Sequence, residues 1–355
     1  MMNSSEITKE SQNPFTLSFG KIPSLYISRL FQTEEIVRDF RQAVPSSQVY
    51  MITGVRGSGK TVFMSGISKE FEQESDWLVI ELNPNRDLLQ SLAAALYALP
   101  GMAALFIKAK LDFSFLGFGA TIEGGNPIFD IESALARMLE VIQNAGKRVL
   151  ICIDEASNTE HMRIFASSFQ MLIRQDYPIC LLMTGLYENI YDLQNEKNLT
   201  FLYRAPKVRL EPLNFTAVRA NYEKTLRVSR EEAGQLASIV KGYPYAFQLL
   251  GYLYWTNAPA TADEILPLFD QYLDEYVYSK IWSELSGKDK FVLNAMAESE
   301  AENVKDLRES LRMTSNEFSV YRDRLLRKGV IGAPERGRVV FLLPRFREFV
   351  TTKEV

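Results

Sequence analysis

One glycine-rich stretch constrains this chain of 355 residues more than any other feature. The residues from Gly54 to Thr61 match the pattern G-x-x-x-x-G-K-[ST] in full. A short apolar run of β-forming residues, Val49–Thr53, precedes the stretch, and a helical pattern follows it. A glycine-rich turn that matched the pattern by chance could occur anywhere, whereas a phosphate-binding loop lies between a strand and a helix, as this stretch does. The sequence therefore predicts nucleotide binding within an α/β fold.

The residue types in this loop suit phosphate chemistry. Glycines let backbone N–H groups converge on phosphate oxygens, and the following helix directs its positive N-terminal end at the same oxygens. Lys60 is expected to reach the β- and γ-phosphates, and the Thr61 hydroxyl to hold Mg²⁺. The residues predicted to bind ATP or ADP here are Gly54, Val55, Arg56, Gly57, Ser58, Gly59, Lys60 and Thr61.

A second signal lies where the apolar run Arg148–Ile153 ends in Asp154 and Glu155. Carboxylates at the carboxyl end of a parallel strand point into the crevice where α/β sheets bind ligands. Asp154 is predicted to bind the magnesium through water, and Glu155 to polarise the attacking water as a general base. The alternative is that the two acidic residues only stabilise a helix N-terminus, but the presence of the phosphate loop favours the catalytic interpretation.

Two further catalytic candidates come with equally good structural alternatives. Thr184 ends the next apolar run and could bond the γ-phosphate or its attacking water, or simply form the turn with Gly185. Arg204 is a candidate arginine finger that would neutralise charge on the transferred phosphoryl group. An arginine in a surface ion pair explains Arg204 as well.

Apolar strand-like runs alternate with helical patterns through the first two thirds of the chain. The runs at 77–82, 149–153 and 179–184 are nearly continuous in apolar residues, and 207–210 is a further, shorter strand-like run. This pattern indicates a parallel sheet covered on both faces. From 214 the pattern is helical only, and after 283 three short helices precede two strand-like runs. The sequence predicts four parts: an N-terminal segment at 1–47, an ATPase core at 48–213, a helical lid at 214–282 and a winged helix at 283–355. The 113–122 run is expected to form a hairpin or an irregular insertion.

With these features in order, the chain resembles an AAA+ P-loop ATPase of the archaeal-ATPase and STAND-like branch related to origin-recognition ATPases. Further matching stretches are 13–16, 170–174, 242–251 and 321–331. The resemblance implies that Pro244 packs against adenine, with Pro23 and Ile27 closing its other side. The chain departs from the family pattern at two positions. Tyr245 stands where a second-sensor arginine is usual, and Thr184 stands at the first-sensor position, where an asparagine is common. Both departures suggest slow turnover or a nucleotide-held switch.

The expected winged helix is basic within an acidic chain. Between Lys305 and Arg347 there are eleven basic and five acidic residues, against a net charge of −4 for the whole chain. This charge suits contact with a DNA backbone, and a protein-docking module is the alternative. The residues expected to face DNA are Ser315, Asn316, Ser319 and Arg322 on the recognition helix and Arg336 and Arg338 on the wing.

Composition excludes several other classes of protein. Two cysteines are too few for a disulfide framework or a cysteine zinc site, and a single histidine excludes multi-histidine metal sites. No signal peptide is recognisable, and a reducing, cytoplasmic location is expected. The stretch 88–107 carries no charge, but Pro100-Gly101 interrupts it, so two helices meeting at a turn are favoured over a membrane span.

The sequence thus predicts a slow Mg²⁺-dependent ATPase whose nucleotide state controls a winged-helix module. Double-stranded DNA, a protein and a second copy of the chain are candidate partners, and no membrane is expected. The alternative is a regulator or scaffold that holds nucleotide without hydrolysing it and acts through DNA or protein binding. Glu155 favours the enzyme, and the missing sensor arginine favours the regulator.

Overall fold

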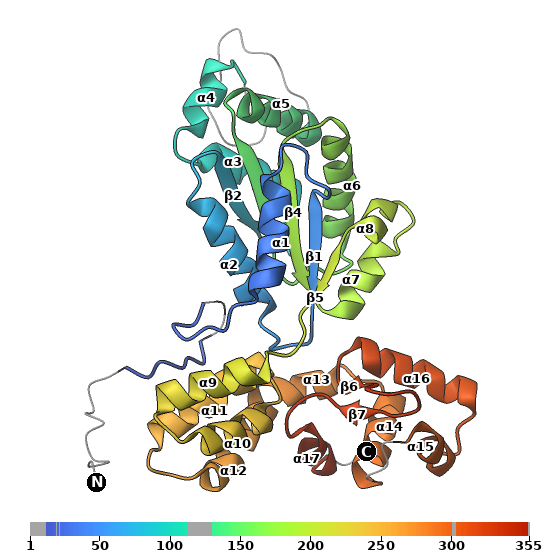
Figure 1. Cartoon of the computed structure of the whole chain (residues 1–355). Helices are drawn as coiled ribbons and strands as arrows, with labels where there is room; N and C mark the ends of the chain where they lie inside the picture. Colours follow the sequence, from blue (N-terminus) through green and yellow to red (C-terminus); the bar gives the residue numbers. More distant parts are fainter. Residues whose placement is uncertain (1–11, 19, 21, 112–129, 300–302, 354–355) are drawn as a thin grey trace. The chain divides into compact units, whose positions relative to one another are not determined.

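The computed structural model describes residues 12–18, 20, 22–111, 130–299 and 303–353 (Figure 1). They fall into two compact units. The sheet unit comprises Arg29–Gly54 and Lys60–Leu210, and the helical unit comprises Met1–Ser28, Val55–Gly59 and Glu211–Val355. The expected hairpin at 113–122 lies outside the described residues, and the four-part division of the chain stays a prediction.

A parallel sheet forms the centre of the sheet unit, as predicted. Its strands follow the order β2-β3-β4-β1-β5, and every described pair is parallel. The bounds are β1 Val49–Thr53, β2 Trp77–Leu82, β3 Arg148–Ile153, β4 Ile179–Gly185 and β5 Lys207–Arg209. Because β4 pairs with both β1 and β3, the carboxyl ends of these three strands meet at one edge.

Both faces of the sheet are buried, which explains why its strands lack an alternating polar pattern. Tyr50 and Leu182 pack with α1 and α2 in one apolar cluster, whereas Met51 and Leu181 pack with α3–α8 in another. The helices are α1 Leu30–Arg41, α2 Lys60–Glu72, α3 Leu88–Ala98, α4 Met102–Lys108, α5 Ile131–Asn144, α6 Glu160–Arg174, α7 Tyr187–Gln194 and α8 Thr200–Arg204.

The uncharged stretch at 88–107 forms two helices, as expected. Asp87 caps α3 by accepting hydrogen bonds from the backbone N–H groups of Leu89 and Gln90, and Gly101 at φ 79° is the N-cap residue of α4. In the described part of the chain, no single helix is long and apolar enough to cross a membrane. The α3–α4 pair passes that test by length and composition together, but it is bent by 94°.

The helical unit contains the all-α segment expected after 214. Its elements are α9 Phe215–Leu226, α10 Arg230–Val240, α11 Pro244–Thr256, α12 Ala262–Leu273, a π-helix at Asp274–Tyr278 and α13 Ser279–Ser283. Phe15, from the N-terminal segment, packs against Tyr222 and Phe247 in the same core. A side chain at Gly251 would overlap the Phe15 ring, so α11 offers a glycine there.

Three helices and a hairpin follow, which is the arrangement of a winged helix-turn-helix. They are α14 Gly287–Glu298, α15 Val304–Ser310, α16 Ser315–Arg327, β6 Ile331–Gly332 and β7 Val340–Phe341. The strands are antiparallel, with one further bridge between Asn303 and Arg338. The sequence did not predict the last helix, α17 Phe346–Thr351.

Asp39 provides a test of the sheet unit's stability. Its buried carboxylate accepts hydrogen bonds from the backbone N–H groups of Ser46 and Ser47 and from the Tyr50 hydroxyl, at 2.7, 3.1 and 2.9 Å. Burial opposes ionisation, but these hydrogen bonds outweigh it and lower the pKa of Asp39. We expect Asp39→Ala to reduce the free energy of unfolding by about 1–3 kcal/mol, because three donors lose their acceptor.

Urea denaturation at pH 7 measures this loss, with the exposed Asp192→Ala as control. A carboxyl whose pKa is lowered on folding stabilises the protein above its unfolded pKa, so the difference should shrink only when the pH falls below about 3.8. A difference that is absent at neutral pH, or equal in the control, would contradict this role for Asp39.

Candidate functional site

Asp154 lies at the centre of a polar cluster built from three elements of the sheet unit. Its Oδ2 accepts a hydrogen bond from the hydroxyl of Thr61, at the start of α2, at 2.6 Å. Its Oδ1 accepts one from the hydroxyl of Thr184, in β4, and another from the Glu155 N–H at 3.0 Å. Thr184 is fully buried. The structure therefore brings together three residues that the sequence selected separately.

Glu155 adopts an unusual backbone conformation at the end of β3. Its φ is 54°, in the left-handed region that a non-glycine residue enters at a cost of about 1–2 kcal/mol. Its N–H points at Asp154 and Thr184, and the following Ala156 N–H bonds the Thr184 carbonyl at 2.7 Å. The Glu155 carboxylate is exposed and makes no hydrogen bond or ion pair with any described residue. The strained turn thus leaves this carboxylate available to a ligand or a water molecule.

The loop at 54–61 has the geometry of a phosphate cradle. Gly57 and Gly59 have φ of 78° and 86°, which other residues rarely adopt. Lys60 Nζ lies 2.9 Å from the Gly54 carbonyl, so its ammonium is folded back along the loop. Among the described residues, the buried Ser58 hydroxyl has no hydrogen-bond partner. A buried hydroxyl without a partner within a loop of this geometry fits an oxygen-rich anion such as phosphate.

The donor set beside the loop also fits magnesium. The Thr61 hydroxyl and the Asp154 carboxylate offer two oxygen atoms 2.6 Å apart. Hard oxygen donors of this kind, completed by phosphate oxygens and water, are the ligands that Mg²⁺ prefers. The donor chemistry of Thr61 and Asp154 therefore fits Mg²⁺.

Residues 55–59 of the loop also contact other parts of the helical unit. The Tyr243 hydroxyl donates to the Arg56 carbonyl, and the Tyr245 N–H donates to the Gly57 carbonyl at 3.2 Å. Arg56 forms an ion pair of 3.1 Å with Glu284, and the Val55 side chain occupies the space beside Gly329. Tyr243 was not among the site residues that the sequence predicted. Its place directly before Pro244, within the stretch 242–251, is the only sequence signal that could have selected it.

The remaining nucleotide candidates lie in different places. Pro244 is the first residue of α11, and a Cβ built on Gly59 would be 3.8 Å from its Cβ. Ile27 and Pro23 are half-buried in the same unit, and Ile27 packs against its apolar core. Arg204 is the exposed last residue of α8 and bonds no described residue. Its role as an arginine finger stays a prediction.

The expected DNA-facing residues differ in how free they are. Ser315, Asn316 and Ser319 are exposed on α16, and Arg336 is exposed on the hairpin with no partner among the described residues. Arg338 is exposed, and its guanidinium forms an ion pair of 3.6 Å with the Glu335 carboxylate. Arg322 is half-buried and forms an ion pair of 3.3 Å with Asp323. Arg336 on the wing is therefore more exposed and less engaged by neighbouring residues than Arg322 on α16.

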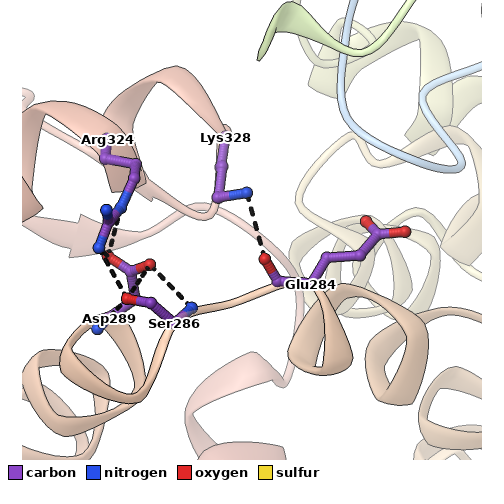
Figure 2. A network of polar contacts seen from close by, with 5 residues as sticks. All are labelled: Glu284, Ser286, Asp289, Arg324 and Lys328. Atoms are coloured by element: carbon purple, nitrogen blue, oxygen red, sulfur yellow. Dashed lines mark hydrogen bonds and ion pairs between the residues drawn. The ribbon is translucent and has the colours of Figure 1, made fainter. Parts of the chain in front are cut away.

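Part of the positive charge in this region serves the fold. Arg324 donates to the buried Asp289 carboxylate at 2.6 and 2.8 Å and to the Ser286 hydroxyl at 2.7 Å (Figure 2). Ser286 and Asp289 also form the capping box that begins α14. Arg345 is held by Asp270 at 2.5 and 2.6 Å. The count of basic residues in the sequence therefore overstates the charge that a ligand would meet.

Comparison with known proteins places the fold. Residues 275–350 match a domain of unknown function (DUF8462). No curated protein matches the chain. Among solved structures, the Walker-type ATPase PABY2304 of Pyrococcus abyssi is 14% identical with a TM-score of 0.66, and the alignment covers 92% of this chain and 96% of that one.

A second similar structure is the ORC2 protein of Aeropyrum pernix in ADPNP–ADP complexes. It is 14% identical with a TM-score of 0.59, over 94% of this chain and 96% of that one. Its ADP form gives a TM-score of 0.50 over the same shares. The chain therefore shares its fold with this Walker-type ATPase and with the ORC2 protein, which confirms the fold that the sequence resemblance implied.

The Thr184–Asp154 hydrogen bond allows a direct test of the cluster. We expect Thr184→Val to lower the free energy of unfolding by about 1–3 kcal/mol, because the half-buried Asp154 carboxylate loses a donor. Chemical denaturation of the nucleotide-free protein measures the change. Thr200→Val, at an exposed position in α8, is the control. Equal stability of the two variants would show that the hydroxyl contributes nothing to the cluster.

Proposed function

We propose that this chain binds Mg²⁺-ATP at the loop 54–61 and hydrolyses it slowly, and that its nucleotide state controls the winged helix. One observation carries the proposal: Asp154 is hydrogen-bonded to the first helical turn after a complete phosphate loop, beside an exposed carboxylate. The fold is shared with a protein described as a Walker-type ATPase, which supports the same conclusion. We also propose the four-part division of the chain given by the sequence.

Each residue of the site has a distinct part in this proposal. The loop N–H groups and Lys60 bind the phosphates, and Lys60 leaves the Gly54 carbonyl to do so. Thr61 and Asp154 hold the magnesium, which when bound supplies neutralisation of charge on the phosphate oxygens. Glu155 accepts a proton from the attacking water, and its freedom from other partners suits this role. Ile27, Pro23 and Pro244 contact the adenine.

Two features support slow turnover. By the resemblance, Tyr245 stands where a second-sensor arginine is usual, and its own N–H is bonded to the loop. The Thr184 hydroxyl is bonded to Asp154, so it must exchange partners before it can bind the γ-phosphate or its water. The same two features support the rival proposal, a regulator that holds nucleotide without turnover.

Phosphate release separates the enzyme from the regulator. We expect wild type to release phosphate from Mg²⁺-ATP, and Glu155→Gln to lower the rate constant at least 100-fold while nucleotide binding persists, because the amide cannot accept the proton. A steady-state phosphate assay measures the rate, and Glu160→Gln, an exposed residue in α6, is the control. If wild type binds nucleotide without turnover, the enzyme proposal fails and the regulator proposal is supported.

We further propose that the winged helix contacts the backbone of double-stranded DNA through its wing. Arg336→Ala should weaken binding about 2- to 5-fold at low salt and reduce the slope of log K against log salt by about 1, because one phosphate contact is lost. Fluorescence anisotropy with a labelled duplex measures both quantities. The exposed Arg86→Ala in the sheet unit is the control.

Failure of wild type to bind DNA at low salt would reject the DNA proposal, because backbone contacts are strongest there. An equal loss in Arg86→Ala would show that the effect arises from overall charge and not from the wing. In either case the protein-docking alternative for the winged helix would be favoured.

A further inference from the structure

Tyr243 reaches the phosphate loop from a point far away in the sequence. It lies 187 positions from Arg56, whose carbonyl oxygen accepts a hydrogen bond from the Tyr243 hydroxyl. Both residues belong to the helical unit. Tyr243 is only 5% exposed, and burial raises the pKa of its hydroxyl above the ordinary value, so the group remains a donor over the whole physiological range.

The loop is shaped to receive this hydroxyl. A Cβ built on Gly57 would overlap the Tyr243 hydroxyl and would lie 3.1 Å from the Tyr245 Cβ. Gly57 also has a φ of 78°, so an alanine there would be strained even without the tyrosine. The glycine therefore meets two demands, one from the loop's own conformation and one from Tyr243.

The hydrogen bond fixes the orientation of one peptide group. In a trans peptide the C=O of Arg56 and the N–H of Gly57 point in opposite directions. When the Arg56 carbonyl is held toward Tyr243, the Gly57 N–H is directed away from Tyr243. The Tyr245 N–H holds the next carbonyl, that of Gly57, in addition. Two consecutive peptide groups of the loop are thus oriented by the residues on either side of Pro244.

We propose that Tyr243 is a positioning residue for phosphate binding, because it holds the Arg56–Gly57 peptide so that the Gly57 N–H is available to a phosphate oxygen. This inference rests on the proposed nucleotide site. It also gives the start of α11 a direct mechanical connection to the phosphate loop, in addition to any contact of Pro244 with adenine. Movement of this part of the helical unit would alter phosphate affinity through the loop backbone.

The test compares two buried tyrosines whose hydroxyls donate to different backbone carbonyls. Tyr222 is fully buried, and its hydroxyl donates to the Phe247 carbonyl at 2.8 Å. Tyr222→Phe therefore removes a similar hydrogen bond from the same unit without touching the loop. Isothermal titration of the full chain with Mg²⁺-ATP gives the dissociation constant of each variant, and thermal melting reports their stability.

We expect Tyr243→Phe to raise the dissociation constant for Mg²⁺-ATP about 5-fold, and Tyr222→Phe to leave it within about 1.5-fold of wild type, at similar losses in melting temperature. Hydrogen exchange of the nucleotide-free protein is the second measurement. Amides of the peptide spanning 54–61 should exchange faster in Tyr243→Phe than in wild type and Tyr222→Phe.

The outcomes separate this inference from the proposed function. If wild type binds Mg²⁺-ATP and the two variants show the same affinity and loop exchange, Tyr243 has only a structural role and the inference is overturned. If wild type binds no Mg²⁺-ATP, the proposed function fails, and the loop-exchange comparison alone decides whether Tyr243 holds the loop. Unchanged exchange in Tyr243→Phe overturns the inference in that case too.

Discussion

The pairing of Asp154 with two threonine hydroxyls is the interaction on which the site depends. The two oxygens of one carboxylate connect the first turn of α2, the end of β3 and the buried end of β4. A carboxylate that is half-buried and accepts several hydrogen bonds fixes its neighbours more tightly than an exposed one. The arrangement sets where the loop joins its helix, and it turns the backbone so that Glu155 projects outward in a left-handed conformation.

Burial of the sheet on both faces supplies the rigidity that this pairing needs. The strands that end at the site carry apolar side chains toward two separate clusters, so neither face can shift without exposing apolar surface. Two of these side chains are the free cysteines Cys152 and Cys180, and burial raises the pKa of each thiol to about 12. They act as apolar side chains and belong to the same apolar cluster.

Much of this organisation follows from local signals in the sequence. The phosphate loop, the strand before it and the carboxylate at the end of β3 are each recognisable within a few residues, and the parallel sheet follows from the apolar runs. Contacts between distant segments could not be predicted in this way. Tyr243 and Arg56 are 187 positions apart, and the packing of Phe15 against Tyr222 carries no periodic signature. The ion pair between Arg324 and Asp289 could not be predicted either, because a count of charged residues does not show which of them are paired within the fold.

The whole proposal requires that the loop at 54–61 binds a magnesium nucleotide. Calorimetric titration of wild type and Lys60→Ala with ATP, each with and without Mg²⁺, measures this binding. We expect wild type to bind one nucleotide per chain, with an affinity that falls when Mg²⁺ is omitted. Lys60→Ala should lose at least 10-fold in affinity, because a lysine that contacts two phosphates is removed. Absence of binding by folded wild type, or equal affinity in the variant, would contradict the proposal.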